Sequence, residues 1–279
     1  MLIVKKMLKD KPAMLGLAIV LLAIIIAVIG PYVAPYPQDA SASHLMRRLR
    51  PPSAEHILGT DNLGRDILSR ILLGTRGALG IALSVVGGAM LIGVPLGLIA
   101  GYSRGPLSSI IMRVTDVFLS LPQLILALAL AQLIGASLRS AMIALTFTYW
   151  PFFARIVFNE TRRLRASLFV DALQGIGANR MRILAYHILP NMMSSLIVRA
   201  TLGLGFTILM AAVLGFLGMG AAPPSPDWGL MIAQSRVYLP DAWWYVTFPG
   251  LAILVMVLGF NLLGDGLRDI LDPKLRRSR

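Results

Sequence analysis

The sequence predicts an all-α membrane protein with six transmembrane helices and both termini in the cytoplasm. Apolar residues make up 57% of its 279 residues and charged residues only 14%. Soluble domains usually carry about a quarter charged residues, so this excess of apolar residues indicates a polytopic membrane protein. The net charge of +13 then indicates membrane orientation, and no basic and aromatic platform points to a nucleic-acid partner.

Charge-free windows locate the helices, since about 20 helical residues span the hydrocarbon of a bilayer. The short window Ser140–Ala154 reaches that length if Arg155 extends its side chain to the membrane surface. We interpret a further window, Ile183–Val198, as loop and helix entry with a break at Pro190-Asn191. The six windows are Pro12–Gln38, Gly77–Ser103, Val117–Leu138, Ser140–Ala154, Ala200–Pro226 and Ala242–Gly264.

Lysines ahead of the first window orient the chain. Cationic segments resist translocation, so Lys5, Lys6, Lys9 and Lys11 predict a cytoplasmic N-terminus. Six spans then return the C-terminus to the cytoplasm. The first apolar run is longer than the roughly 7–15 residues of a signal-peptide core, so we expect a retained helix.

These windows and charges predict the domain organisation of the chain. The parts are a cytoplasmic N-terminus (1–12), the first transmembrane helix (13–36), an extracytoplasmic loop (37–76), a core of five transmembrane helices (77–266) with a cytoplasmic loop at about 159–191, and a cytoplasmic C-terminus (267–279).

Small residues in the second window predict close helix packing. Ala89, Gly93, Gly97 and Gly101 recur every four residues and therefore form one ridge along a helix. Such a ridge lets a neighbouring helix approach closely, which matters in lipid because packing replaces the hydrophobic effect there. Pro95 within the ridge predicts a kink.

The segment 162–191 is a patterned basic loop. It is rich in arginine, contains the single acid Asp171, and has two breakers at Gly175 and Gly177. We expect short helices that turn near these glycines, so that added bulk at Gly177 interferes where helices meet. A helical, partly apolar loop at a membrane surface indicates docking onto a soluble partner. The apolar faces comprise Ala172, Leu173, Ile176, Met181, Ile183 and Leu184.

Arg199 is a charge placed inside the predicted fifth helix. If that helix begins near Asn191, Arg199 lies about 12 Å along it at 1.5 Å per residue. An arginine that faces lipid there costs several kcal/mol of free energy, so we expect Arg199 to face a water-filled substrate pathway. The alternative is a helix-end anchor whose side chain reaches the membrane surface.

Sequence motifs for chemistry are missing. The chain has no GxxxxGK[ST] phosphate loop and no HExxH, and its lack of cysteine excludes thiolate metal sites. The scattered histidines, His44, His56 and His187, make no metal set. Ser103 lies in a GxSxG match, but a nucleophile elbow needs a strand before the serine. We therefore predict no catalytic residue and no bound metal.

The basic loop resembles the EAA loop of ABC importer permeases. Asp171-Ala172-Leu173 stands at the Glu-Ala-Ala position, with Asp for Glu and Leu for the second Ala. Gly177 stands at the following glycine, and 188–190 (Ile-Leu-Pro) at the end of the motif.

Two further blocks place the resemblance within the family. His56–Arg70, which reads HILGTDNLGRDILSR, resembles the signature ahead of the second helix in dipeptide and oligopeptide permeases. Phe248–Gly250, Asn261–Asp269 and Leu271–Pro273 resemble the C-terminal block of the same subfamily. With GFLGMGAAPPSPDWG, the resemblance extends from about residue 14 to 276. By these motifs the chain is identified as a member of the peptide/nickel permease family, of the C type that forms the second permease subunit.

This resemblance implies a type I ABC importer permease fold, with a first helix that reaches across the partner. It implies a coupling helix that docks on a separate ATPase, so that ATP and Mg²⁺ bind to partner subunits and this chain holds no cofactor. The partners are a homologous second permease subunit in a heterodimer, two ATPase subunits, an extracytoplasmic substrate-binding protein and membrane lipid. The coupling residues are Asp171, Ala172, Leu173, Gly177, Ala178 and Pro190.

The expected function is that of a permease subunit in an ATP-driven, binding-protein-dependent importer of di- or oligopeptides, in a bacterial or archaeal cytoplasmic membrane. Nickel chelates, glutathione and opines are alternative substrates within the family. A stand-alone secondary carrier and an intramembrane hydrolase at Ser103 are alternatives from other classes. No acid lies in the six windows, which weighs against a proton-driven carrier.

Overall fold

The computed structural model describes residues 10–271, and this part of the chain is built of helices and loops. Five helices are long and apolar enough to cross a membrane, and a pair of helices joined by a sharp bend brings the number to six if the pair is counted as one span. The predicted all-α fold is therefore confirmed, while most of the predicted terminal segments 1–12 and 267–279 lies outside the described residues. The spanning helices are α2 (Lys11–Val33), α3 (Ile67–Tyr102), the pair α4 (Pro106–Ser120) and α5 (Gln123–Ile134), α6 (Leu138–Arg165), α9 (Leu189–Phe216) and α11 (Trp243–Leu271).

Short helices complete the described chain. They are the 3₁₀ turns η1 (Pro37–Ala40), η2 (Leu45–Arg47) and η4 (Arg236–Tyr238), the α-helical pieces α7 (Leu168–Gly175), α8 (Arg180–Arg182) and α10 (Trp228–Ser235), and the π-helical stretch η3 (Ile183–Ile188).

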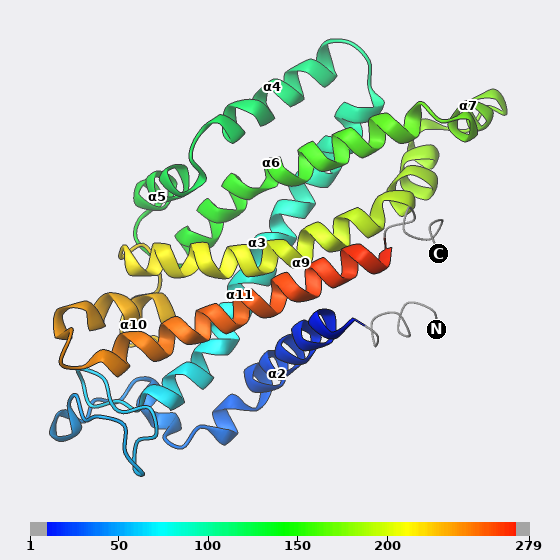
Figure 1. The fold of residues 1–279 in the computed structure, drawn as a ribbon. Helices are drawn as coiled ribbons and strands as arrows, with labels where there is room; N and C mark the ends of the chain where they lie inside the picture. The colour runs from blue at the N-terminus through cyan, green and yellow to red at the C-terminus, as the bar shows by residue number, and fades with distance from the viewer. Residues whose placement is uncertain (1–9, 272–279) are drawn as a thin grey trace.

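The long helices form one bundle. Figure 1 shows α6, α9 and α11 side by side, with α3 crossing them and α2 alongside α11. The helix α7, the start of α2 and the end of α11 lie at one end of the bundle, and α10 and the 34–66 loop lie at the other. This arrangement agrees with the predicted topology. The helix α2 packs on α11 and α3 of its own chain, where the resemblance had implied a reach across a partner.

The predicted small-residue ridge forms the contact between α3 and α6. Ala89 is fully buried, and a β-carbon at Gly97 would lie 2.6 Å from the carbonyl oxygen of Ala154. A β-carbon at Gly101 would lie 2.6 Å from Cβ of Thr161. A side chain at Gly97 or Gly101 would therefore push the two helices apart.

The predicted third helix, Val117–Leu138, is wrong as a single helix. The chain bends by 94° between α4 and α5, and Leu121 at the break has extended φ and ψ of −90° and 139°. The cause is Pro122, whose ring disfavours a helical conformation in the preceding residue.

Other helices run beyond their windows, because a charge ends a window without ending a helix; α11 continues past Gly264 to Leu271, inside the predicted segment 267–279. The helix α3 begins at Ile67, inside the predicted 37–76 loop, and α6 continues to Arg165. The side chain of Arg70 is fully buried in the first turns of α3. Its charge is compensated by protein groups, so the helix can include it.

The predicted break at Pro190-Asn191 is also wrong. The chain is helical from Arg180 to Phe216, with a π-helical stretch that ends at Leu189. The N–H of Leu189 donates to the carbonyl of Leu184, five residues earlier. This wider turn precedes Pro190, whose missing N–H is tolerated at the start of α9. The window Ile183–Val198 thus belongs to the fifth spanning helix.

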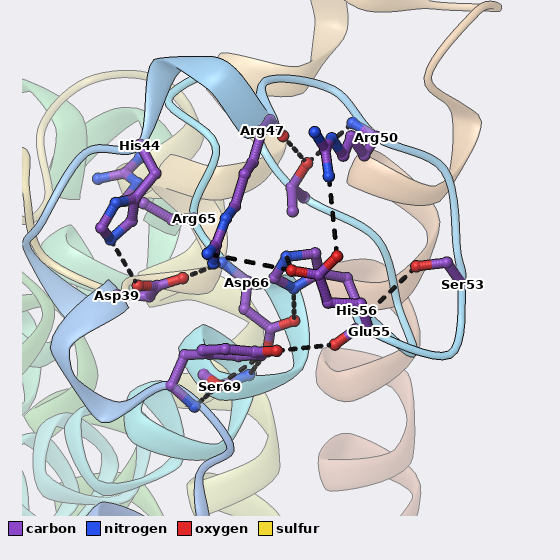
Figure 2. Close-up of polar contacts among 12 residues, drawn as sticks. Asp39, His44, Arg47, Arg50, Ser53, Glu55, His56, Arg65, Asp66 and Ser69 are labelled. Carbon is purple, nitrogen blue, oxygen red and sulfur yellow. Dashed lines mark hydrogen bonds and ion pairs between the residues drawn. The ribbon is translucent and has the colours of Figure 1, made fainter.

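The 34–66 loop is organised by buried charges (Figure 2). Asp66 caps α3 by accepting from the backbone N–H of Ser69 at 2.8 Å, and its other oxygen lies 2.9 Å from Nδ1 of His56. The backbone N–H of Asp66 donates in turn to Asp39 at 2.9 Å. All these side chains are almost completely buried, so the HILGTDNLGRDILSR block folds the loop against the start of α3.

A second buried set ties this loop to the loop before α10. Asp61 accepts from Nε of Arg65 at 2.6 Å, and Nε of Arg70 lies 3.6 Å from the same carboxylate. Arg70 also donates to the backbone carbonyls of Ala40 and Ser225, at 3.0 and 2.8 Å. Loss of one partner of such a buried pair costs about 3–5 kcal/mol, because it leaves an unpaired charge.

The orientation of the bundle can be tested in this cysteine-free chain. Ala222→Cys lies in the exposed segment before α10, and Met181→Cys lies near α7 at the other end, 70% exposed. We expect a membrane-impermeant thiol reagent added to whole cells to label Ala222→Cys only. Met181→Cys should label after the membrane is opened, and the reverse pattern would contradict the topology.

Candidate functional site

The loop predicted to be cytoplasmic forms a short helix that stands at the end of the bundle (Figure 1). After α6 ends at Arg165, α7 runs from Leu168 to Gly175, with Asp171 in its first turn. A carboxylate there is favourable because the N-terminal end of a helix dipole is positive. Val170 is fully buried and packs with Ile183 and the partly buried Leu173. These contacts hold one face of α7 against the spanning helices.

Gly177 ends α7 through a Schellman motif. The N–H of Gly177 donates to the carbonyl of Gln174, and the N–H of Ala178 donates to that of Leu173, both at 3.0 Å. This motif needs a left-handed residue after the helix, and Gly177 has a φ of +79°. A side chain at Gly177 would meet no atom within 4 Å. Backbone conformation, and not the bulk that we expected to matter, therefore selects glycine.

The outer face of α7 is apolar and exposed. Leu168 is 86% exposed and Ile176 is 81% exposed. Phe169, Asp171 and Ala172 are exposed beside them. Exposed apolar side chains on a short helix at the end of the bundle are typical of a site of protein–protein interaction.

The core contacts α7 through Tyr102 at the end of α3. Gln174 donates from Nε2 to the Tyr102 hydroxyl at 3.1 Å. The guanidinium of Arg165 lies 5.1 Å from the centre of the Tyr102 ring and donates to its backbone carbonyl. Since Tyr102 directly follows Gly101, the last residue of the ridge, the α3–α6 contact positions α7.

The structure thus divides the predicted coupling residues between two faces and a turn. Asp171 and Ala172 lie on the exposed face, whereas Leu173 and Ala178 face the core and Gly177 makes the turn. Pro190 belongs to the start of α9. Five residues that anchor or complete α7 were missed in the sequence analysis: Leu168, Phe169, Val170, Gln174 and Tyr102. The apolar residues Leu168, Phe169 and Val170 could have been found, because they continue the apolar pattern of the loop.

Arg199 lies over aromatic rings of α6 and lines a cavity. Its guanidinium carbon lies 5.6 Å from the ring centre of Tyr149 and 5.1 Å from that of Phe152. The cavity has a volume of about 710 Å³ between α6, α9 and α11. Cation–π contacts and an open cavity both reduce the cost of an arginine at this depth. The other polar residues that line this cavity are Glu160, Arg163, Asn191, Ser194, Ser195 and Arg268.

The geometry supports neither a catalytic site at Ser103 nor a metal site in the described part of the chain. Ser103 caps the end of α3 and has no histidine within hydrogen-bond distance in the described part of the chain. Among residues 10–271, no three His, Asp or Glu side chains gather as a metal site would require.

Comparison with known families identifies the chain. Residues 93–277 match the model for the binding-protein-dependent transport system inner membrane component. Residues 2–52 match the N-terminal transmembrane domain of oligopeptide transport permease C. The chain belongs to the binding-protein-dependent permease family. It is a permease subunit of an ABC importer in the cytoplasmic membrane, and ATP hydrolysis takes place in separate subunits.

Relatives match over almost the whole chain. The dipeptide transport system permease protein DppC of Alkalihalophilus pseudofirmus is 43% identical over 272 residues, which cover 98% of this chain and 89% of the relative. The probable D,D-dipeptide permease DdpC of Escherichia coli is 44% identical, with coverages of 96% and 90%. The glutathione permease GsiD of Pectobacterium atrosepticum is 42% identical, with coverages of 98% and 90%.

A solved structure supports the fold. The permease of the inward-facing MetNI methionine ABC transporter matches with a TM-score of 0.60 and 21% identity, covering 73% of this chain and 97% of that one. The predicted type I importer fold is therefore confirmed, and an importer of this class works with an ATPase and a substrate-binding protein.

The conformational role of Gly177 gives a prediction with a matched control. Alanine in a left-handed conformation costs about 1–2 kcal/mol, so Gly177→Ala should increase local opening of α7 about five- to thirtyfold. Amide hydrogen exchange of residues 168–178 measures this opening. Gly175→Ala adds the same methyl group within the helix, where it also meets no atom within 4 Å.

We expect Gly175→Ala to leave α7 unchanged or slightly more protected, because alanine favours a helix over glycine by about 0.5–1 kcal/mol. Equal exchange rates in the two variants would contradict the assignment of Gly177 as the helix-ending residue.

Proposed function

We propose that this chain is the C-type half of a heterodimeric permease that imports di- or oligopeptides. The observation that carries this proposal is its sequence identity of 43–44% to permeases named for dipeptide and D,D-dipeptide transport, together with the match to the N-terminal domain of permease C. Glutathione is the alternative that GsiD favours. Nickel chelates and opines are further alternatives within the resemblance.

In this proposal α7 is the coupling helix and docks onto one of two ATPase subunits, which bind ATP and Mg²⁺. Its support is the exposed apolar face of Leu168, Phe169, Ala172 and Ile176, next to the charge of Asp171. The inner face, held by Val170 and the bond between Gln174 and Tyr102, transmits force to α3 and α6.

The docking role predicts the effect of a polar residue on this face. Burial of an isoleucine contributes about 1.5–3 kcal/mol, so Ile176→Ser should weaken retention of the ATPase subunits about tenfold or more. Ile57→Ser is the matched control, because Ile57 is 60% exposed in the extracytoplasmic loop.

Co-purification with a tagged permease and ATP-dependent uptake in proteoliposomes measure the effect. Membrane insertion should be equal in both variants. If Ile176→Ser retains the ATPase subunits and supports uptake as the parent does, α7 is not the docking helix.

We further propose that the Arg199 cavity is part of the substrate pathway. A peptide carries a carboxylate at its C-terminus, and the cavity brings Arg163, Arg199 and Arg268 together with one acid, Glu160. The serine and asparagine side chains of α9 add neutral hydrogen-bonding groups. This composition suits a weak, passing contact with an anionic group.

Arg199→Gln should therefore reduce uptake of a dipeptide relative to its C-terminal amide. We expect the ratio of the two uptake rates to fall about tenfold, because hydrogen bonds to charged groups contribute about 1.5–3 kcal/mol. Arg199→Lys keeps the charge and should keep most of the ratio. An unchanged ratio in Arg199→Gln leaves Arg199 as a helix anchor.

The same assay on the parent importer, with its own binding protein, tests the substrate class. Competition by unlabelled di- and tripeptides supports the proposal. Uptake of glutathione or a nickel chelate without competition by peptides would replace it.

A further inference from the structure

A second cavity lies beside the bundle at the end where α7 stands, and the transport function leaves it unused. It has a volume of about 530 Å³ and lies between the end of α3, the 103–105 turn, the start of α4 and the end of α6. It shares no lining residue with the Arg199 cavity. The GxSxG match at residues 101–105 forms one of its walls.

Three arginines line this cavity: Arg104, Arg162 and Arg165. In the described part of the chain none of them has a carboxylate within 4.0 Å, whereas the neighbouring Arg155 and Arg163 pair with Asp116 and Glu160. Three like charges around one hollow repel each other. An anion in the hollow would relieve this repulsion.

Two of the arginines are held by groups that are not acids. Arg165 stacks over Tyr102 and donates to its backbone carbonyl, and the guanidinium carbon of Arg162 lies 5.9 Å from the ring centre of Phe158. Such stacking orients a guanidinium while its charge stays unpaired. Two of the three guanidinium groups are therefore oriented by rings and stay available to an anion.

The remaining lining groups favour a phosphate. Ser103 and Ser109 also line the cavity, and guanidinium groups bind phosphate oxygens through paired hydrogen bonds. The α4 dipole, whose positive end lies at Pro106, adds a smaller contribution to the same potential.

We propose that this cavity binds a phosphate group, supplied by an anionic phospholipid of the cytoplasmic leaflet. The cavity lies where α3 and α6 end, next to the cytoplasmic loop, which is the level of the lipid headgroups in the predicted topology. Basic pockets between helices on this side of a membrane are typical sites for anionic headgroups. A bound headgroup would brace the turn that carries Tyr102 and hence the base of α7.

The test uses the complete importer in detergent, titrated separately with phosphatidylglycerol, phosphatidylcholine and inorganic phosphate. Thermal stabilisation and native mass spectrometry report the binding. We expect saturable stabilisation of the parent by phosphatidylglycerol and none by phosphatidylcholine. Arg104→Gln and Arg162→Gln should each weaken this binding about fivefold, since each basic residue near an anionic surface contributes about 1 kcal/mol.

Arg113→Gln is the matched control, because Arg113 is exposed on α4 and does not line the cavity. The Arg113→Gln variant also loses one positive charge, and we expect it to bind phosphatidylglycerol as the parent does. Neither Arg104 nor Arg162 makes a hydrogen bond that the fold needs in the described structure, so both variants are expected to assemble.

Three results would overturn the proposal. Equal phosphatidylglycerol binding by the cavity variants and the parent would remove the site. Equal stabilisation by inorganic phosphate, with displacement of the lipid, would make the ligand a soluble phosphate. Loss of ATPase subunits from Arg104→Gln or Arg162→Gln, with lipid binding unchanged, would make the cavity a docking surface for the ATPase. Peptide uptake by the parent is measured separately, so failure here leaves the transport proposal standing.

Discussion

The close approach of α3 and α6 is the contact on which the rest of this permease depends. Gly93, Gly97 and Gly101 leave one stripe of α3 without side chains and Ala89 adds only a methyl group, so the backbone of α6 lies close against it. In lipid, such packing replaces the hydrophobic effect as the force between helices. The stripe ends at Tyr102, whose hydroxyl contacts Gln174 of α7. This hydrogen bond and the packing of Val170 connect α7 to the spanning helices.

The two ends of the bundle are stabilised by different physical interactions. At the extracytoplasmic end, buried ion pairs and capping bonds of Asp61, Asp66 and Arg70 fold a long loop that contains little regular structure. At the other end the arginines lie around open cavities, and most have no acidic partner in the described chain. Charged side chains at one end therefore pair with each other and stabilise the fold, whereas the arginines at the other end are available to ligands.

The exposed surfaces of the described chain differ in the partners that they suit. The outer face of α7 is apolar and convex, which suits burial in a groove of another protein. The cavity lined by Arg104, Arg162 and Arg165 is cationic, which suits a small anion instead. The outer face of α2, with Leu21, Leu22 and Ile25, is apolar and part of a spanning helix. That face is matched to lipid or to a second permease subunit.

The sequence by itself determined the class of fold, the ridge on α3 and the turn at Gly177, because each depends on composition or on spacing within one segment. It also determined the family, since the motifs at 56–70 and 171–190 are local. Only the tertiary structure decided the bend at Leu121-Pro122, the continuous helix through Pro190 and the start of α3 at Ile67. The burial of Arg70, the inward face of Leu173 and the gathering of Arg104, Arg162 and Arg165 were likewise decided there. The physical reason is that a charge ends an apolar window in a sequence, whereas in the folded chain carbonyls, carboxylates and rings from distant segments can surround it.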